Sequence, residues 1–205
     1  MSLIKKLYFY LIYLYNKIIL KKQRVHITNK TISNIRGKLF VNNKGKLTIE
    51  DHVRINSRYR NNPIGGQTFT SFVVSANAEL IIKSGVGLSN SAIVAHKRIV
   101  IEENVYIGGD CKIYDTDFHS LDYDTRLAND NDIRTKEVTI GKGAFIGTGS
   151  IILKGVRIGE KSIIGAGSVV TKSVPPNEIW AGNPARFIKK LGEEVEKSYA
   201  NIRSL

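Results

Sequence analysis

Hydrophobic positions in the second half of the chain recur with a period of six residues. From residue 140 to residue 174 an aliphatic side chain stands at every sixth place, and a small or branched residue follows it four positions later. The aliphatic set is Ile140, Ile146, Ile152, Ile158, Ile164 and Val170, and the second set is Ala144, Ser150, Val156, Ser162, Ser168 and Val174. Helices repeat every 3.6 residues and half-buried strands every 2. The pattern therefore predicts a stack of short, similar units.

Glycine follows the aliphatic residue in four of these units, at Gly141, Gly147, Gly159 and Gly165. Each unit is therefore expected to be a short strand with its aliphatic side chain inward, followed by a turn that tolerates unusual backbone angles. Three such strands would close one triangular coil of about eighteen residues, the size of a solenoid repeat. The pattern predicts an all-β solenoid whose core exists only because the coils stack.

The same spacing extends upstream, although less regularly. One coil contains Ile101, Ile107 and Ile113, with Val105 and Cys111 at the fifth place, and earlier coils contain Ile82, Leu88 and Val94, then Ile49 and Ile55, then Ile35 and Val41. Two insertions, at 58–72 and at 114–137, interrupt the pattern. Solenoids carry long insertions as loops on one face, where binding and catalytic residues gather. The insertions are therefore the first places to search for function.

Composition agrees with one folded domain and two different ends. The chain has 205 residues, enough to bury a sizeable core. Its single cysteine, Cys111, excludes an intramolecular disulfide framework and falls at an inward position of the repeat, which predicts a core residue. Lys and Arg number 31 against 18 Asp and Glu, a formal net charge of +13, which predicts anionic partners. No nucleic-acid module accompanies this charge, and coenzyme phosphates or an anionic membrane surface explain it at least as well.

Residues 1–24 form a basic and apolar segment of a different kind. Their uninterrupted apolar run, residues 7–15, is nine residues long, too short to span about 30 Å of hydrocarbon. No small-residue cleavage site follows, which argues against a signal peptide. The polar sector of a helical wheel contains Lys5, Lys6, Tyr13, Asn16, Lys17 and Lys21. The segment predicts a basic amphipathic helix that lies in a membrane interface, or that docks on the protein's own stack or on a partner subunit.

The end of the repeat is marked by two prolines. Pro175 and Pro176 follow Val174 directly, and proline cannot donate to a strand ladder. The dipeptide Asn183-Pro184 predicts a turn. Residues 187–205 mix charged and apolar positions, and they predict a short helix that caps the last coil, as a solenoid requires.

The repeat resembles that of the left-handed β-helix, or hexapeptide-repeat, acyltransferases. The resemblance covers roughly residues 35–191 and is specific at three points: the repeat itself, the segment DTDFHSLD at 115–122, and the final segment IGAGSVVTKSVPPNEIWAGNPARFIKKL at 164–191. It points to the maltose, galactoside and xenobiotic acetyltransferase branch, particularly its members in surface-polysaccharide synthesis. The resemblance implies a left-handed parallel β-helix over 25–186, acetyl-CoA as the acyl donor, and a homotrimer whose neighbouring chains build each active site together.

The resemblance makes His119 the general base. In this family the histidine removes a proton from the acceptor's hydroxyl or amine, which then attacks the thioester of acetyl-CoA directly. Imidazole suits the task because its pKa lies near working pH, and such a base contributes about 10²–10⁴ in rate. The alternative is a surface-loop histidine without a role. His26 and His52 are expected at the surface, and because no histidines cluster in the sequence, no metal site is expected.

Five further residues are expected to bind the acceptor. Asp115, Asp117 and Asp122 surround His119; one of them can orient its imidazole, although aspartates equally cap loops through bonds to backbone. Asn90 matches an acceptor-contacting asparagine of the galactoside enzymes, although asparagine suits a plain turn as well. His96 lies one coil earlier in the same turn, where it contacts the acceptor or supports the loop.

The acetyl-CoA contacts implied by the resemblance lie in the last coils. Positions along the pantetheine arm are matched by Thr148 and Ala166, with low walls at Gly147 and Gly165 and an apolar ring at Phe145. Positions near the nucleotide and its phosphates, where fixed positive charge is useful, are matched by Thr171, Lys172 and Arg186.

These features together predict a CoA-dependent O-acetyltransferase that acts on a sugar hydroxyl during assembly of a capsule, O-antigen or exopolysaccharide. It would work in the cytoplasm or at the inner face of the cell membrane, and the basic amino-terminal segment favours a lipid-linked acceptor. The alternatives are N-acetylation of an amino sugar, another acyl donor, a small xenobiotic acceptor, and a non-catalytic β-helix scaffold.

Overall fold

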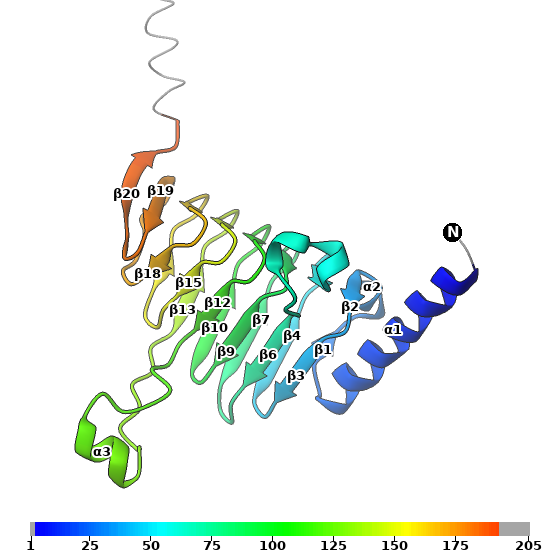
Figure 1. Ribbon diagram of the computed structural model, residues 1–205, viewed down its shortest axis with the longest axis horizontal. Helices are drawn as coiled ribbons and strands as arrows, with labels where there is room; N and C mark the ends of the chain where they lie inside the picture. Colours follow the sequence, from blue (N-terminus) through cyan, green and yellow to red (C-terminus); the bar gives the residue numbers. More distant parts are fainter. Residues whose placement is uncertain (1–2, 193–205) are drawn as a thin grey trace, which may run out of the picture.

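The computed structural model describes residues 3–192 as a parallel β-helix with a helix at one end and a hairpin at the other (Figure 1). The coils stack into three sheets. Sheet A contains β1 (His26–Ile27), β4 (Lys46–Ile49), β7 (Glu79–Ile82), β10 (Arg98–Ile101), β13 (Val138–Ile140) and β16 (Arg157–Ile158). Sheet B contains β2 (Ile35–Gly37), β5 (Arg54–Ser57), β8 (Gly87–Ser89), β11 (Tyr106–Ile107), β14 (Phe145–Ile146), β17 (Ile163–Ile164), β19 (Glu178–Gly182) and β20 (Ala185–Lys190). Sheet C contains β3 (Phe40–Asn43), β6 (Ser71–Val74), β9 (Ala92–Ala95), β12 (Lys112–Tyr114), β15 (Ile151–Ile152) and β18 (Val169–Val170).

The core consists of aliphatic columns that run along the stack. In sheet B, Ile107 pairs with Ile146 and Ile146 with Ile164 in parallel register, and all three are buried. Neighbouring coils therefore place like side chains on one another, while backbone groups pair with the coils before and after. This arrangement confirms the six-residue prediction and the solenoid. It also confirms the inward position of Cys111, which is fully buried.

The two insertions leave from different edges of the triangular prism. The chain runs from sheet A to sheet B to sheet C in each coil, so that one edge lies between sheets B and C (the B/C edge) and another between sheets C and A (the C/A edge). Residues 58–70, with two short 3₁₀ turns (Tyr59–Asn61 and Pro63–Gly65), follow β5 at the B/C edge. Residues 115–137, with α3 (Tyr123–Ala128), follow β12 at the C/A edge. The prediction of a single loop-bearing face was therefore wrong, and Figure 1 shows the loops on opposite sides of the stack.

The first insertion is also shorter than predicted at its end. Ser71 and Phe72 belong to β6, and the Phe72 side chain is fully buried. The dense polar stretch before these residues hid the start of the strand, whose inward positions are Phe72 and Val74.

The amino-terminal helix α1 (Leu3–Lys22) lies across the first coil, and the short helix α2 (Asn29–Ile32) follows β1. Ile12 and Leu20, which belong to α1, are buried on the face of the helix that contacts the stack. Asn16 is fully buried; its Nδ2 donates to the Gly37 carbonyl at 2.9 Å and its Oδ1 accepts from the Leu39 amide at 3.1 Å. One face of the helix therefore docks on the stack. Among the described residues, no helix has the length and apolarity needed to cross a membrane.

The carboxy-terminal end is closed by a hairpin. β19 pairs in parallel with β17 and antiparallel with β20, and the connection passes through the predicted turn at Asn183-Pro184. The prediction of a helix from residue 187 was wrong for residues 187–190, which belong to β20. These residues become a strand because β19 presents a second edge of unpaired backbone groups. The rest of that prediction, from residue 193, lies outside the described residues.

Candidate functional site

His119 lies on the C/A loop (residues 115–137) with its side chain exposed. Its Nδ1 lies 2.5 Å from Oδ2 of Asp130. The other oxygen of Asp130 accepts the Ser120 amide at 2.6 Å. The Ser120 amide and His119 hold the pKa of Asp130 below its usual range, so the carboxylate stays ionised at neutral pH. A carboxylate at Nδ1 places the imidazole's proton on that nitrogen and leaves Nε2 as the basic position.

The residue before His119 has a strained backbone. Phe118 has φ 65°, a conformation that bulky residues rarely adopt. Its ring packs against His96 at 5.9 Å between centroids and against Tyr114 at 5.2 Å. Strain of this kind persists only where surrounding contacts impose it, and it is found at functional sites. Here it sets the direction in which His119 leaves the stack.

Asp115 supports the base of the loop and does not face the acceptor. It is fully buried, and its two oxygens accept backbone amides from His96 at 2.7 Å, Lys97 at 2.8 Å and Arg98 at 2.7 Å. The expectation that Asp115 binds the acceptor is therefore corrected. His96 lies near the root of the loop, as expected, and its bond to Asp115 and contact with Phe118 favour the supporting role over the acceptor contact.

The other two predicted aspartates also make internal bonds. Asp117 forms an ion pair with Lys154 at 2.6 Å. Asp122 caps α3 by accepting the Thr125 amide at 2.8 Å, and this amide lowers the pKa of Asp122. Neither lies within bonding distance of His119, so the carboxylate that orients the imidazole is Asp130. Asp130 could not be recognised from the short acidic motif, because it lies eleven residues beyond His119 and outside that motif.

Asn90 lies at the B/C edge, away from His119 of the same chain. It is buried beneath the first insertion, where its Nδ2 donates to the Asn62 carbonyl at 3.2 Å. Its Oδ1 is buried without a partner among the described residues. Within one chain, the structure does not bring Asn90 and His119 together.

The predicted coenzyme residues fall into separate groups. At the B/C edge the coils approach so closely that a side chain at Gly147 would meet the Ala166 amide at 2.5 Å. Thr148 bonds to the Gly109 carbonyl at 2.5 Å, and Ala166 follows it on the next coil with an exposed side chain. The glycines therefore permit close stacking, whatever else they do. This B/C group comprises Gly147, Thr148, Gly165 and Ala166.

The remaining coenzyme residues lie on other parts of the prism. Thr171 and Lys172 follow β18 at the C/A edge, on the same side as His119, and both are exposed. Arg186 lies in β20, and Phe145 faces outward from sheet B with its side chain half-exposed. The B/C group and the C/A pair therefore lie at the two opposite edges of sheet C.

Cys111 has no features of a catalytic nucleophile. It is fully buried, and burial raises the pKa of its thiol to about 11. Its Sγ lies 3.2 Å from the Gly147 carbonyl. Among residues 3–192 no group of three His, Cys, Asp or Glu side chains is placed to hold a metal ion.

The repeat matches known transferases. Residues 137–172 match the sequence model of the bacterial transferase hexapeptide family (six repeats). The chain is 40% identical over 105 residues to the Saccharomyces cerevisiae protein YJL218W, which is named provisionally as an acetyltransferase; the match covers 51% of this chain and 52% of that protein. The chain thus spans about half the length of this curated relative.

Solved structures support the same fold. A variant of AntD, an N-acyltransferase from Bacillus cereus in complex with dTDP-4-amino-4,6-dideoxyglucose and coenzyme A, superposes with a TM-score of 0.65 at 22% identity, covering 93% of this chain and 98% of that one. A hexapeptide-repeat acetyltransferase from Vibrio cholerae gives a TM-score of 0.51 at 24% identity, covering 78% and 70%. Together with the repeat match at residues 137–172, these similarities show that the chain has the fold of the solved hexapeptide-repeat structures.

Proposed function

We propose that the protein is an acetyl-CoA-dependent O-acetyltransferase that modifies a sugar hydroxyl during surface-polysaccharide assembly. The observation that carries this proposal is His119 itself, which is exposed on the C/A loop and held at Nδ1 by Asp130. A sugar hydroxyl is a weak nucleophile until its proton is removed, so an oriented base favours a hydroxyl acceptor. The repeat family and the acetyltransferase relative support the same class of reaction.

The reaction needs no covalent acyl-enzyme. Nε2 of His119 takes the proton of the acceptor hydroxyl while the oxygen bonds to the carbonyl carbon of acetyl-CoA. The carbon–sulfur bond then breaks, and the departing thiolate of CoA takes up a proton. The pKa of the buried Cys111 thiol, about 11, keeps it protonated and out of this chemistry at neutral pH.

A homotrimer explains why the predicted residues lie on separate edges. In two prisms that lie side by side, one acetyl-CoA could contact the B/C group (Gly147, Thr148, Gly165 and Ala166) of one chain and the C/A pair (Thr171 and Lys172) of the next. Exposed positive charge at Lys172 and Arg186 suits the phosphates of the coenzyme. Sedimentation equilibrium checks the assembly, and a monomer at micromolar concentration that still turns over would contradict it.

Turnover measured by release of free thiol tests the activity. Wild type, His119→Ala and the matched control His26→Ala, an exposed histidine in β1, are compared on a panel of sugar hydroxyl and amino-sugar acceptors. We expect turnover to fall about 10²–10⁴-fold in His119→Ala alone, with binding of CoA retained. Full activity in His119→Ala would exclude the base, turnover only with amino sugars would mean N-acetylation, and absent CoA binding would favour a scaffold.

The outer face of α1 supports work at a membrane surface. Opposite the docked face, Leu3 is 82% exposed, Leu7 and Leu11 56%, and Ile18 66%. The exposed lysines Lys6, Lys17, Lys21 and Lys22 flank this stripe. Residues 1–49 contain eleven Lys and Arg and neither Asp nor Glu. An apolar stripe edged by lysines is suited to the interface of an anionic bilayer.

Vesicle sedimentation tests this location. We expect the protein to sediment with phosphatidylglycerol vesicles and not with phosphatidylcholine vesicles, and to be released by salt. The pair Leu7→Asp and Leu11→Asp changes only exposed positions and should abolish binding. A wild-type protein that ignores both kinds of vesicle would exclude peripheral attachment through α1.

A further inference from the structure

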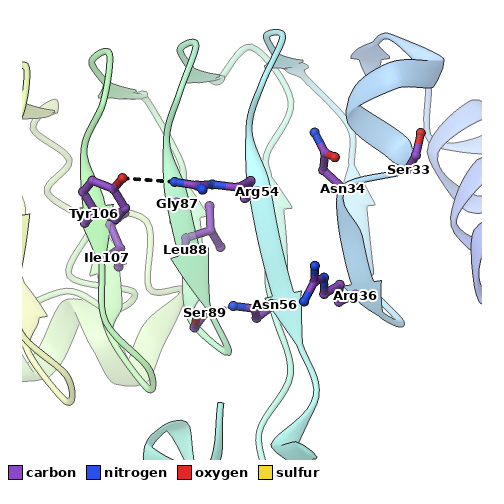
Figure 2. Close-up of a pocket in the computed structure, with 10 residues that line it drawn as sticks. All are labelled: Ser33, Asn34, Arg36, Arg54, Asn56, Gly87, Leu88, Ser89, Tyr106 and Ile107. Atoms are coloured by element: carbon purple, nitrogen blue, oxygen red, sulfur yellow. Dashed lines mark hydrogen bonds between the residues drawn. The ribbon is translucent and has the colours of Figure 1, made fainter. Parts of the chain in front are cut away.

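A polar pocket of about 440 Å³ lies on the outer face of sheet B, across the first four coils (Figure 2). Its floor is Gly87 in β8, whose missing side chain leaves a depression between two longer neighbours. In the paired register, Arg54 of β5 stands on one side of Gly87 and Tyr106 of β11 on the other. The pocket is therefore built by the repeat, from outward positions that the core does not use.

The Arg54 guanidinium is held in place over this floor. Its Nη2 donates to the Tyr106 hydroxyl at 3.0 Å, and the guanidinium lies 5.9 Å from the centre of the Tyr106 ring. Figure 2 shows the Arg54 side chain reaching across the Gly87 strand to the tyrosine. An arginine fixed at one nitrogen keeps its other donors free in a set direction.

A second guanidinium lines the same pocket. Arg36 of β2 pairs in register with Asn56 of β5, and the two side chains lie next to each other in Figure 2. Hydroxyl and amide groups complete the lining, at Ser33, Asn34, Asn56 and Ser89. Among residues 3–192, neither arginine forms an ion pair with a carboxylate. Two uncompensated guanidinium groups with neutral donors beside them are the chemistry that binds phosphate.

We propose that this pocket binds the phosphate or diphosphate by which the acceptor sugar is carried. The biological meaning of the site rests on the proposed sugar acetylation, whereas phosphate binding itself does not. Both a nucleoside diphosphate and a lipid diphosphate present the same group to Arg36 and Arg54. Tyr106 is half-exposed and pairs in register with the equally exposed Phe145, so an aromatic surface adjoins the pocket. A nucleobase can stack on such a surface.

The position of the pocket links it to a neighbouring chain. His119 leaves from the C/A edge, the edge of a triangular prism that lies opposite sheet B. A sugar attached to a phosphate in this pocket therefore lies on a different side of the prism from His119 of the same chain. In the trimer proposed above it would be presented to His119 of a neighbouring subunit.

Calorimetric titration of the full chain tests the site directly. The probes are inorganic pyrophosphate, UDP and farnesyl diphosphate. The test variant is a double variant that carries both Arg36→Ala and Arg54→Ala. The matched control is Arg157→Ala, which removes one exposed arginine from β16 of sheet A. We expect the double variant to bind pyrophosphate about tenfold more weakly or worse, and the control to bind as wild type does. Equal loss in Arg157→Ala, or no binding of any probe to wild type, would overturn the proposal.

Comparison of the probes identifies the source of the phosphate. Tighter binding of UDP than of pyrophosphate supports a nucleotide carrier, and tighter binding of farnesyl diphosphate supports a lipid carrier. Affinity for CoA should be the same in wild type and the double variant; a tenfold loss there would assign the pocket to the donor and overturn the proposal. Because pyrophosphate binding requires no turnover, it separates failure of this site from failure of the proposed acetyl transfer.

The conservative variant Tyr106→Phe adds a second readout. It keeps the ring and removes only the hydroxyl that holds Arg54. We expect it to weaken pyrophosphate binding less than the loss of both arginines does, without any change in thermal stability. Binding that is unchanged by Tyr106→Phe and by the double variant alike would show that the pocket holds no phosphate.

Discussion

The regular coils from β13 to β18 and the C/A loop are built by opposite means. In the coils the same small set of contacts is repeated, so that buried aliphatic columns and parallel backbone ladders hold every unit. In the loop each support occurs once: Asp115 holds the root, Asp130 holds His119 and Asp122 caps α3. Stability in the coils is therefore shared among many equivalent residues, whereas order in the loop depends on single carboxylates.

This contrast teaches where substitutions should act on stability and where on chemistry. Removing an inward aliphatic residue leaves a cavity in a column that cannot easily collapse. Removing a loop carboxylate frees backbone amides or an imidazole while the columns stay intact.

The strongest test uses two consecutive isoleucines of β15. Ile152 is fully buried and Ile151 faces outward, half-buried. We expect Ile152→Ala to lower the free energy of unfolding by about 2–5 kcal/mol and Ile151→Ala by about 1 kcal/mol or less. Guanidinium denaturation at one protein concentration measures both. Equal losses would mean that β15 is not organised by its inward face.

The next test concerns the root of the loop. Asp115→Ala leaves three backbone amides without their acceptor, which should cost about 1–3 kcal/mol. Hydrogen exchange should quicken at His96, Lys97 and Arg98 and stay slow in β14 and β17. Asp122→Ala is the control, because it removes only the cap of α3. Unchanged exchange at the three amides would show that Asp115 does not hold this turn.

A smaller effect, visible only in activity, is expected from Asp130→Asn. The imidazole of His119 loses the charged partner at Nδ1, and kcat for acetyl transfer should fall about tenfold, part of the 10²–10⁴ a general base contributes. The KM for acetyl-CoA should not change, and Asp124→Asn on the same loop should behave as wild type. A loss confined to KM would show that Asp130 acts on binding and not on the base.

The pH dependence follows from the same pair. The pKa of Asp130 is lowered from 3.8, so the stabilisation from its bonds is present above pH 3.8 and is lost only as pH falls through the lower folded value. Asp130 is thus ionised at neutral pH, and the acid limb of the activity profile should not come from protonation of Asp130. We expect His119→Ala to remove the acid limb and Asp130→Asn to retain it, and pH–rate profiles of both variants check this.

The smallest effect concerns the cysteine inside the coils. Burial raises the pKa of Cys111 from 9.0 to about 11. The folded protein therefore holds the thiol proton more tightly, and the stabilisation is full below pH 9.0 and is lost as pH rises toward 11. At pH 8 we expect almost no reaction with an aromatic disulfide reagent until the protein is unfolded. Rapid labelling of the native protein would show that this column opens.

Much of the fold could be predicted because the repeat is local. The six-residue period from Ile140 to Val170 predicts which side chains face inward, and those side chains are buried in the structure. The hairpin of β19 and β20 could not be predicted in this way, since Phe187 becomes part of a strand only where β19 offers it an edge. The docking of Asn16 could not be predicted either. A helical wheel places Asn16 in the polar sector of α1, whereas in the structure its side-chain amide is bonded to the first coil.

The sequence alone determined the solenoid and the place of the second insertion, on which His119 lies, because a six-residue period and its interruptions are properties of neighbouring residues. Tertiary structure decided what no local pattern contains. It put the insertions on different edges, gave Asp130 and not Asp115 to the imidazole, and joined Arg36, Arg54 and Tyr106 from three strands in one pocket. The physical reason is that stacking brings together residues about one coil or more apart, and distance along the chain does not reveal which of them will meet.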